Sequence, residues 1–403
     1  MSNIAMEQER LYSAHNYNPL PVVLVRGEGV YLWDEMGKQY LDMMSAYSAV
    51  SHGHCHPKLV QVLQNQAAKL NIISRAFYSD KLGHFLKRAC ELTGFDKALP
   101  MNTGAEAVET ALKAARKWAY TVKGVASDKA EIIVCAGNFH GRTIAIIGMS
   151  TEANYREGFG PFPPGFKIIP YNDVSALEKV ITKNTAAFLV EPIQGEGGII
   201  VPSEGYLKAC KALCEKNNVL MICDEIQTGL GRTGKLLAYQ HENIQPEALI
   251  LGKALGGGLL PVSLFLARKD IMDVFTPGDH GSTFGGNPLA AAVGDAALAV
   301  LIEENLIDAA AKMGEYFQSC LKSISSPLIK EIRGKGLLIG LEVDSRYPAR
   351  NICLKLLQQG LLTKETHSTV IRFAPPLVIT KEQIDKAIAI LKRVFEEASK
   401  EFS

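Results

Sequence analysis

The chain has 403 residues, of which 47% are hydrophobic and 21% charged, and its formal net charge is +1. This composition suits a globular protein of more than one domain and argues against a nucleic-acid-binding surface. No apolar run reaches the about 18 residues that a membrane span needs, and the first residues lack a signal- or transit-peptide pattern. The eight cysteines are scattered without a C-x-x-C motif, which predicts a reduced, cytoplasmic protein.

The first predicted elements are short. From Val22 to Tyr40, β-rich pieces alternate with glycines, which is the pattern of a small meander. Helical periodicity follows from Pro57 to Leu70. Thr103 or Gly104 then opens a long helix that is predicted to end near Ala119.

The middle of the chain alternates between short apolar strands and helices. The predicted strands are Glu131 to Cys135, Ala186 to Val190, Val219 to Cys223 and Ala248 to Leu251, and a helix is predicted from Pro202 to Lys216. This pattern predicts a parallel sheet that is buried on both faces. In such sheets the ligand binds beyond the carboxyl ends of the strands, so the polar residues there are candidates for the site.

After Pro288 the pattern changes to that of a smaller α+β unit. The predicted elements are a helix from Pro288 to about Glu304, a strand, turn and strand from Ile329 to Val343, and helices at Ala349 to Gln359 and Lys381 to Lys400 around a strand at Val370 to Phe373.

One glycine-rich stretch suggests a nucleotide. G-L-G-R-T-G, from Gly229, matches a dinucleotide pattern, and the stretch to Lys235 nearly matches a phosphate loop. No helix start stands at the third glycine, however, and Leu236 occupies the position of the Ser or Thr that would bind Mg²⁺. A glycine-rich turn is therefore favoured, and a nucleotide-binding protein that uses Gly229–Lys235 is the remote alternative.

Two groups of possible metal ligands are weaker still. In H-G-H-C-H, residues 52–56, adjacent side chains cannot all face one ion, and no second Cys/His group follows at finger spacing. Cys210 and Cys214 stand four apart on a predicted helix, where they suit its buried face. No metal site is predicted.

Three ionisable residues each follow an apolar strand: Glu191, Asp224 and Lys253. A desolvated amine beside a carboxylate suits pyridoxal 5'-phosphate, whose aldehyde bonds to a lysine and whose pyridinium nitrogen pairs with an acid. The predicted helix start at Thr103 and Gly104 offers N–H groups to the phosphate. The plainer alternatives are a solvated lysine and an ordinary helix cap.

Specific motifs extend this interpretation over most of the chain. They are N-T-G-A-E-A, F-H-G-R-T, E-P-I-Q-G-E-G-G, D-E-I-Q-T-G-L-G-R-T-G, L-G-K-A-L-G-G-G, H-G-S-T-F-G-G-N-P-L and R-F-A-P-P-L. With them the chain resembles the class III (subgroup II) pyridoxal-phosphate aminotransferases of fold type I. The resemblance implies an α/β fold: a large domain, residues 46–288, with a mainly parallel central sheet flanked by helices. The N-terminal segment, 1–45, and the C-terminal part, 289–403, would form a small α+β domain.

The resemblance also implies the residues that hold the cofactor. Lys253 and Asp224 would be catalytic, and the further cofactor residues would be Thr103, Gly104, Ala105, Phe139, Gln227, Ser282 and Thr283. Ser282 and Thr283 match a loop that reaches the phosphate of a neighbouring subunit in this family. A homodimer or a dimer of dimers is therefore expected.

Within the family, H-N-Y-N-P-L-P and S-A-Y-S-A-V-S-H-G-H-C-H-P are similar to members that move the δ-amino group of L-ornithine to 2-oxoglutarate, giving L-glutamate 5-semialdehyde and L-glutamate. Arg142 would bind the carboxylate remote from the reacting amine, and Arg372 the α-carboxylate of glutamate. Glu196 would pair with Arg372 while ornithine is bound.

Tyr17, Tyr47 and Glu191 complete the expected substrate residues. F-H-G-R-T, with His140 after Phe139, is common in enzymes that act on acetylornithine. An aminotransferase of acetylornithine or another ω-amino acid is therefore the alternative.

Overall fold

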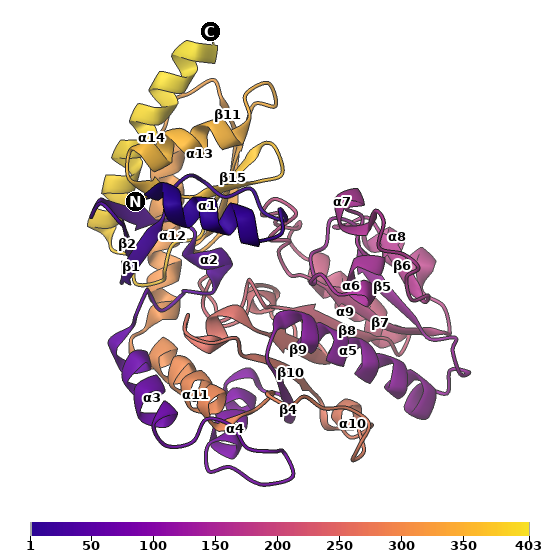
Figure 1. Ribbon diagram of the computed structural model, residues 1–403. Helices are drawn as coiled ribbons and strands as arrows, with labels where there is room; N and C mark the ends of the chain where they lie inside the picture. Colours follow the sequence, from indigo (N-terminus) through magenta and orange to yellow (C-terminus); the bar gives the residue numbers. More distant parts are fainter. Residues whose placement is uncertain (1, 403) are drawn as a thin grey trace.

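The computed structural model describes residues 2–402, and a seven-stranded sheet lies at its centre (Figure 1). The strand β10 runs antiparallel to both of its neighbours, and the other pairs are parallel. In sheet order the strands are β4 (Lys97–Met101), β10 (Ser263–Ala267), β9 (Ala248–Leu251), β8 (Leu220–Asp224), β7 (Thr185–Val190), β5 (Glu131–Cys135) and β6 (Phe166–Ile169).

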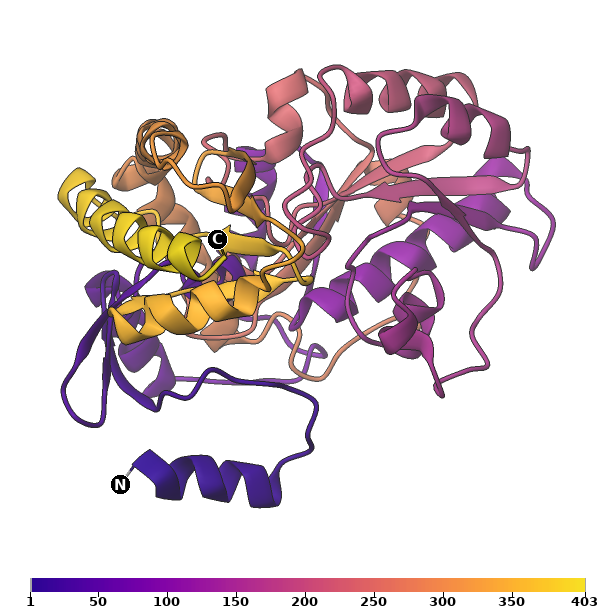
Figure 2. The same ribbon diagram turned by 90° about the horizontal axis from the view of Figure 1, so that it is seen from above.

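Helices cover both faces of this sheet (Figure 2). In β7, Phe188 and Val190 belong to the core on the α9 side (Tyr206–Lys216), whereas Ala187 and Leu189 belong to the core on the α5 side (Gly104–Trp118). Alternate residues point to opposite faces because the side-chain period of a strand is two. The predicted parallel sheet with two buried faces is thereby confirmed.

The remaining helices lie around this centre (Figure 1). They are α1 (Ser2–Tyr12), α2 (Ser45–Ser48), α3 (Pro57–Ala67), α4 (Leu82–Thr93), α6 (Ile144–Gly148), α7 (Ala153–Arg156), α8 (Val174–Val180), α10 (Lys269–Met272), α11 (Pro288–Glu303), α12 (Leu306–Lys322), α13 (Ala349–Gln358) and α14 (Lys381–Phe402).

Two smaller sheets lie beside the central one. The predicted meander forms β1 (Leu24–Glu28), β2 (Tyr31–Asp34) and β3 (Gln39–Asp42), and β13 (Leu361–Leu362) joins β3 in parallel. The second sheet has the order β11 (Ile329–Lys335), β12 (Leu338–Val343), β15 (Val370–Phe373) and β14 (Lys364–Thr366). The N- and C-terminal parts of the chain thus share one sheet, while the domain bounds 1–45, 46–288 and 289–403 stay a prediction.

Some predicted bounds were wrong. The helix expected from Pro202 begins only at Tyr206, because Gly205 has a left-handed φ of 83° and interrupts it. Cys210 and Cys214 face the core from this helix, as predicted, and neither is exposed.

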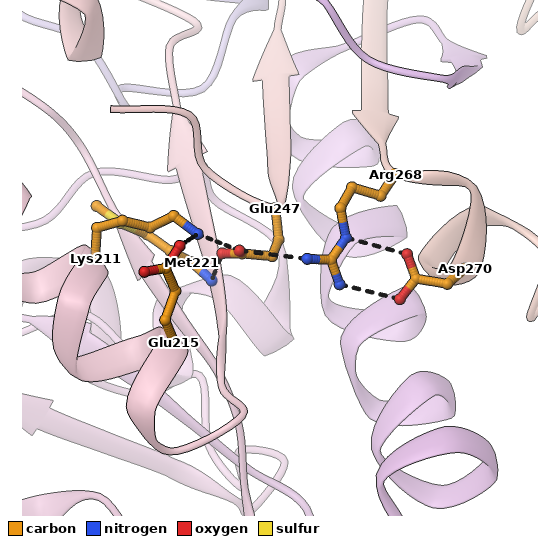
Figure 3. A network of polar contacts seen from close by, with 6 residues as sticks. All are labelled: Lys211, Glu215, Met221, Glu247, Arg268 and Asp270. Carbon is orange, nitrogen blue, oxygen red and sulfur yellow. Dashed lines mark hydrogen bonds and ion pairs between the residues drawn. The ribbon is translucent and has the colours of Figure 1, made fainter. Parts of the chain in front are cut away.

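A polar network fixes the amino ends of the central strands (Figure 3). Glu247, just before β9, accepts a hydrogen bond from the Met221 N–H of β8 at 2.9 Å and pairs with Lys211 of α9. Arg268, just after β10, lies 3.5 Å from Glu247 and also pairs with Asp270. This network lies at the end of the sheet opposite to the carboxyl ends of the parallel strands, where a ligand site is expected.

The helices of residues 2–402 include none whose length and apolar character would let it cross a membrane.

Candidate active site

The carboxyl ends of three neighbouring strands bring the predicted ionisable residues together. Asp224 is the last residue of β8, Glu191 follows β7, and Lys253 comes two residues after β9. All three line a cavity of about 190 Å³. Gly104, Phe139 and Gln227 line the same cavity, so the structure gathers most of the predicted cofactor residues around one space.

The buried Asp224 carboxylate has a partner that the sequence analysis did not assign. His140 Nδ1 lies 2.7 Å from Asp224 Oδ2, and the Ile226 N–H donates to Oδ1 at 3.1 Å. Burial alone would lower the pKa of His140, but the hydrogen bond and charge of Asp224 raise it above 6.5. The position of His140 in F-H-G-R-T was visible in the sequence, whereas its partner was not.

Lys253 lies partly buried at the junction of two cavities. Its φ is 45°, a left-handed value that costs a non-glycine residue on the order of 1–3 kcal/mol. Desolvation lowers the pKa of its amine to about 8, against the opposing attraction of Glu196. At pH 7 about a tenth of this amine is therefore neutral, and thus nucleophilic, whereas an amine with an ordinary pKa near 10.4 is almost entirely protonated.

Glu191 was expected among the substrate residues, and the structure places it in the smaller cavity instead. It accepts hydrogen bonds from the N–H groups of Phe139 at 3.0 Å and Gly195 at 3.3 Å. Burial raises the pKa of Glu191 to about 7, although the charge of His140 opposes the shift. The charges that act on the pKa of Glu191 are thus those of His140 and Asp224.

The start of α5 carries N–H groups that can bind an anion. Thr103 and Glu106 make a capping box, and the N–H groups of Gly104 and Ala105 have no helical acceptor because they lie in the first turn. A Cβ on Gly104 would lie 2.8 Å from Ile226 Cδ1, so a larger residue there would require the end of the Ile226 side chain to move. Ser282 Oγ accepts from Asn102 Nδ2 of the same chain at 3.0 Å, while Thr283 is exposed.

A second cavity of about 660 Å³ opens from Lys253 and Phe139. It brings together the predicted substrate residues Tyr17, Tyr47, Arg142 and Glu196, and adds Tyr155 and Glu365, which the sequence analysis missed. No sequence signal marked Tyr155.

Glu196, which lines this cavity, forms a bidentate ion pair with Arg372, which is buried and does not line it. Arg372 Nη1 lies 2.5 Å from Glu196 Oε1, and Nη2 lies 2.8 Å from Oε2. Gln227 Nε2 donates to Glu196 Oε1 at 3.2 Å. Burial alone would raise the pKa of Glu196, but Arg372 lowers it to about 2, so the carboxylate stays charged at neutral pH.

Arg142 lies at another part of the cavity wall. Its Cζ is 3.4 Å from the centroid of the Tyr155 ring and 5.4 Å from that of Phe139. Stacking on the aromatic rings orients the exposed guanidinium, which can accept a carboxylate in bidentate fashion. The cavity is thus lined by one guanidinium, that of Arg142, and by a carboxylate, that of Glu196, which is paired with the buried guanidinium of Arg372.

These residues fit pyridoxal phosphate. The Gln227 Oε1 is buried without a hydrogen-bond partner among the described residues, beside a cavity that also holds a nucleophilic amine and a carboxylate. Phe139 offers an aromatic face, and the first turn of α5 offers N–H groups at Gly104 and Ala105. The donor set therefore matches an aldehyde, a pyridine ring and a phosphate.

The glycine-rich stretch does not form a nucleotide loop. Arg232 within it is fully buried, and the chain continues into the short 3-10 helix Ala238–Glu242 rather than an α-helix that could face a phosphate. In residues 52–56, His52 bonds to the Ala297 carbonyl, His54 to Asp42 and His56 to Glu304. Their three rings therefore serve separate partners.

The chain belongs to the class-III aminotransferase family, whose model matches residues 12–395. It is 60% identical to an ornithine aminotransferase of Geobacillus sp. (strain WCH70) over 384 residues, which are 95% of this chain and 96% of the relative. A structure of the ornithine aminotransferase from Toxoplasma gondii, with partial occupancy of PLP at its active site, superimposes with a TM-score of 0.98 at 48% identity, covering 100% of this chain and 95% of that one. An acetylornithine aminotransferase from Elizabethkingia anophelis has a TM-score of 0.90 at 52% identity, covering 98% and 99%.

Proposed function

We propose that this protein is a pyridoxal-phosphate enzyme that transfers the δ-amino group of L-ornithine to 2-oxoglutarate, giving L-glutamate 5-semialdehyde and L-glutamate. The observation that carries the proposal is one cavity that extends from Lys253 and is lined by Arg142 and Glu196. Arg142 has no carboxylate partner among the described residues, whereas Glu196 is paired with the buried Arg372. Ornithine offers one carboxylate and needs one free guanidinium. Glutamate offers two carboxylates and needs both.

The chain's own groups divide the chemistry. Bound pyridoxal phosphate supplies an aldehyde that exchanges amino groups and a protonated pyridine ring that accepts electrons. Asp224 holds the proton at the ring nitrogen, and His140 and the Ile226 N–H keep that carboxylate oriented. The Lys253 amine takes the proton from the substrate carbon that bears the reacting nitrogen. The first turn of α5, at Thr103, Gly104 and Ala105, binds the phosphate.

The substrate residues divide into a fixed and a switchable part. Arg142 binds the carboxylate remote from the reacting amine, which is the α-carboxylate of ornithine or the γ-carboxylate of glutamate. Glu196 neutralises Arg372 while ornithine is bound and releases it for the α-carboxylate of glutamate. Tyr17 and Tyr47 border the same cavity and contact the ornithine chain.

The quaternary structure and location are further parts of this proposal. The exposed rings of Phe77, Tyr78 and Phe284 support self-association, in which Ser282 and Thr283 complete the phosphate site of a neighbouring subunit. The eight cysteines are all free thiols, which supports the reducing cytoplasm.

Isotope transfer tests the reaction. With ornithine labelled by ¹⁵N at the δ position and unlabelled 2-oxoglutarate, the product glutamate should carry the label, whereas label at the α position should stay in the semialdehyde. Glutamate labelled only from the α position would contradict the proposal. The second candidate is supported by the Elizabethkingia anophelis likeness, and a strong preference for N-acetylornithine over ornithine in initial rates would favour it.

A further inference from the structure

Residues Ser45–Ser48 form a left-handed turn, although none of them is glycine. Their φ angles are 43°, 47°, 59° and 72° in chain order. L-residues rarely adopt this conformation more than one at a time, because the Cβ crowds the following carbonyl oxygen. Four such residues in a row persist only where their surroundings hold them, and backbone strain of this kind gathers at functional sites.

Asp42 holds the beginning of the turn. Its Oδ1 accepts hydrogen bonds from the N–H groups of Met44 at 2.8 Å and Ser45 at 2.9 Å. Its Oδ2 lies 2.7 Å from His54 Nε2. The carboxylate is buried and both of its oxygens have partners, so the turn begins at a fixed acceptor.

Arg232, from the glycine-rich loop after β8, holds both ends of the turn. Its Nη2 donates to Ser45 Oγ at 3.2 Å and to Ser51 Oγ at 2.9 Å, and Ser51 Oγ donates to the Ser48 carbonyl at 3.0 Å. Its Nη1 donates to the carbonyls of Leu337 at 3.1 Å and Pro375 at 2.5 Å. The motif that resembled a nucleotide loop thus supplies a buried connector between distant chain segments.

One side of the turn lines the substrate cavity, and the other side packs into the protein interior. Ser45 and Ser48 are buried, whereas Ala46 and Tyr47 line the cavity of about 660 Å³. The Arg372 Cζ lies 5.2 Å from the centroid of the Tyr47 ring. Pro375 follows Arg372 by three residues. Arg232 therefore bonds both to the segment that carries Arg372 and to the turn that carries Tyr47.

We propose that Arg232, Asp42 and Ser51 are positioning residues: they hold residues 45–48 left-handed and thereby fix Tyr47 against the Arg372–Glu196 pair, which sets the preference for an ω-amine donor. The choice of ornithine as that donor rests on the proposed function. These residues touch neither substrate nor cofactor, and their effect passes through Tyr47.

A double-mutant cycle tests the route through Tyr47. Ser51→Ala should lower kcat/KM for ornithine about fivefold relative to kcat/KM for glutamate, and this factor should shrink to about one in a Tyr47→Ala background. Ser323→Ala, which removes a hydroxyl that donates to the Cys320 carbonyl outside the site, should leave both ratios unchanged. The same loss in both backgrounds, or an equal loss for both substrates, would overturn the proposal.

A second measurement tests the turn without any activity. Ala46 and Ala389 are both exposed, but Ala389 lies in the right-handed helix α14. Ala389→Gly should shift the unfolding equilibrium about fivefold toward the unfolded state, as glycine does within a helix. Ala46→Gly should leave the unfolding equilibrium unchanged or shift it toward the folded state, since glycine adopts a positive φ without strain. Equal destabilisation by both changes would show that the turn is not held left-handed.

The two proposals fail separately. If the wild-type protein does not use ornithine, the proposed function fails, and the cycle is run with N-acetylornithine or 4-aminobutyrate, whichever it accepts. If ornithine is used but the cycle is additive, the positioning role fails and the proposed function stands.

Discussion

Arg372 and Glu196 face one another through two parallel hydrogen bonds of 2.5 and 2.8 Å, and Arg372 itself is 2% exposed. A paired guanidinium at such a depth cannot attract a second carboxylate unless Glu196 moves away. We therefore expect the pair to favour a substrate with one carboxylate while it is closed, and to admit a substrate with two carboxylates only when Glu196 moves away.

Glu196→Ala should leave Arg372 unmasked. The α-carboxylate of ornithine can then bind there, so that reaction at the α-amine should rise about tenfold relative to reaction at the δ-amine, which corresponds to about 1.4 kcal/mol. Product analysis with position-labelled ornithine measures the ratio. Glu204→Gln, at an exposed carboxylate, is the control. An unaltered ratio in Glu196→Ala would show that the Arg372–Glu196 pair does not select which amino group of ornithine reacts.

Lys253→Ala should lower turnover by about 10²–10⁴-fold or more, because the chain loses the amine that moves the proton. The variant should still bind pyridoxal phosphate, since Asp224 and the first turn of α5 remain. Equilibrium dialysis measures the binding, and borohydride reduction of the wild-type holoenzyme followed by peptide mapping locates the bond. A label at any position other than Lys253 would remove Lys253 from its role.

The pH dependence of cofactor uptake should follow the lowered pKa of Lys253. The neutral amine is the nucleophile, so the rate of pyridoxal phosphate uptake by the apoprotein should increase as pH rises from 7 through about 8 and then level off. Stopped-flow absorbance measures the rate. A lysine with an ordinary pKa near 10.4 would instead give a rate that keeps rising above pH 9.

His140→Asn should destabilise the fold in a pH-dependent way. The folded-state pKa of His140 is raised above 6.5, so its contribution is fully present below pH 6.5 and is lost as pH rises through the raised value. The difference from wild type should be about 2–3 kcal/mol near pH 6, as for a buried charge that loses its partner, and smaller at pH 9. Urea unfolding at the two pH values measures it, and a difference independent of pH would contradict the pairing.

Gly104→Ala should weaken the binding of pyridoxal phosphate about tenfold and destabilise the fold by about 1–3 kcal/mol, because the new Cβ would meet Ile226 Cδ1 at 2.8 Å. Adding Ile226→Val, which removes Cδ1, should restore most of both losses. Gly83→Ala is the matched control, since nothing lies within 4 Å of its added Cβ. Unchanged cofactor affinity and stability in Gly104→Ala would contradict the prediction that the close contact with Ile226 shapes this part of the site.

The central strands were predictable because buried parallel strands are continuous apolar runs. Glu131–Cys135 and Ala248–Leu251 were predicted with the bounds that the structure has. The edge strands β4 and β6 and the antiparallel β10 were missed. The β4 sequence contains Pro100, which argues against a strand unless the strand lies at an edge, and that place is known only once the sheet is assembled.

The sequence by itself determined the chemical types at the site, because an amine and two acids at the ends of apolar strands must meet at one edge of a parallel sheet. It also placed Arg372 and Glu196 in the same site, through motifs rather than through contacts. Only the tertiary structure decided that His140 supports Asp224, that Tyr155 lies under Arg142, and that Arg232 clamps a left-handed turn. These partners are 84, 13 and 181–187 residues apart in the chain, and no local pattern encodes a contact that forms when separate segments pack together.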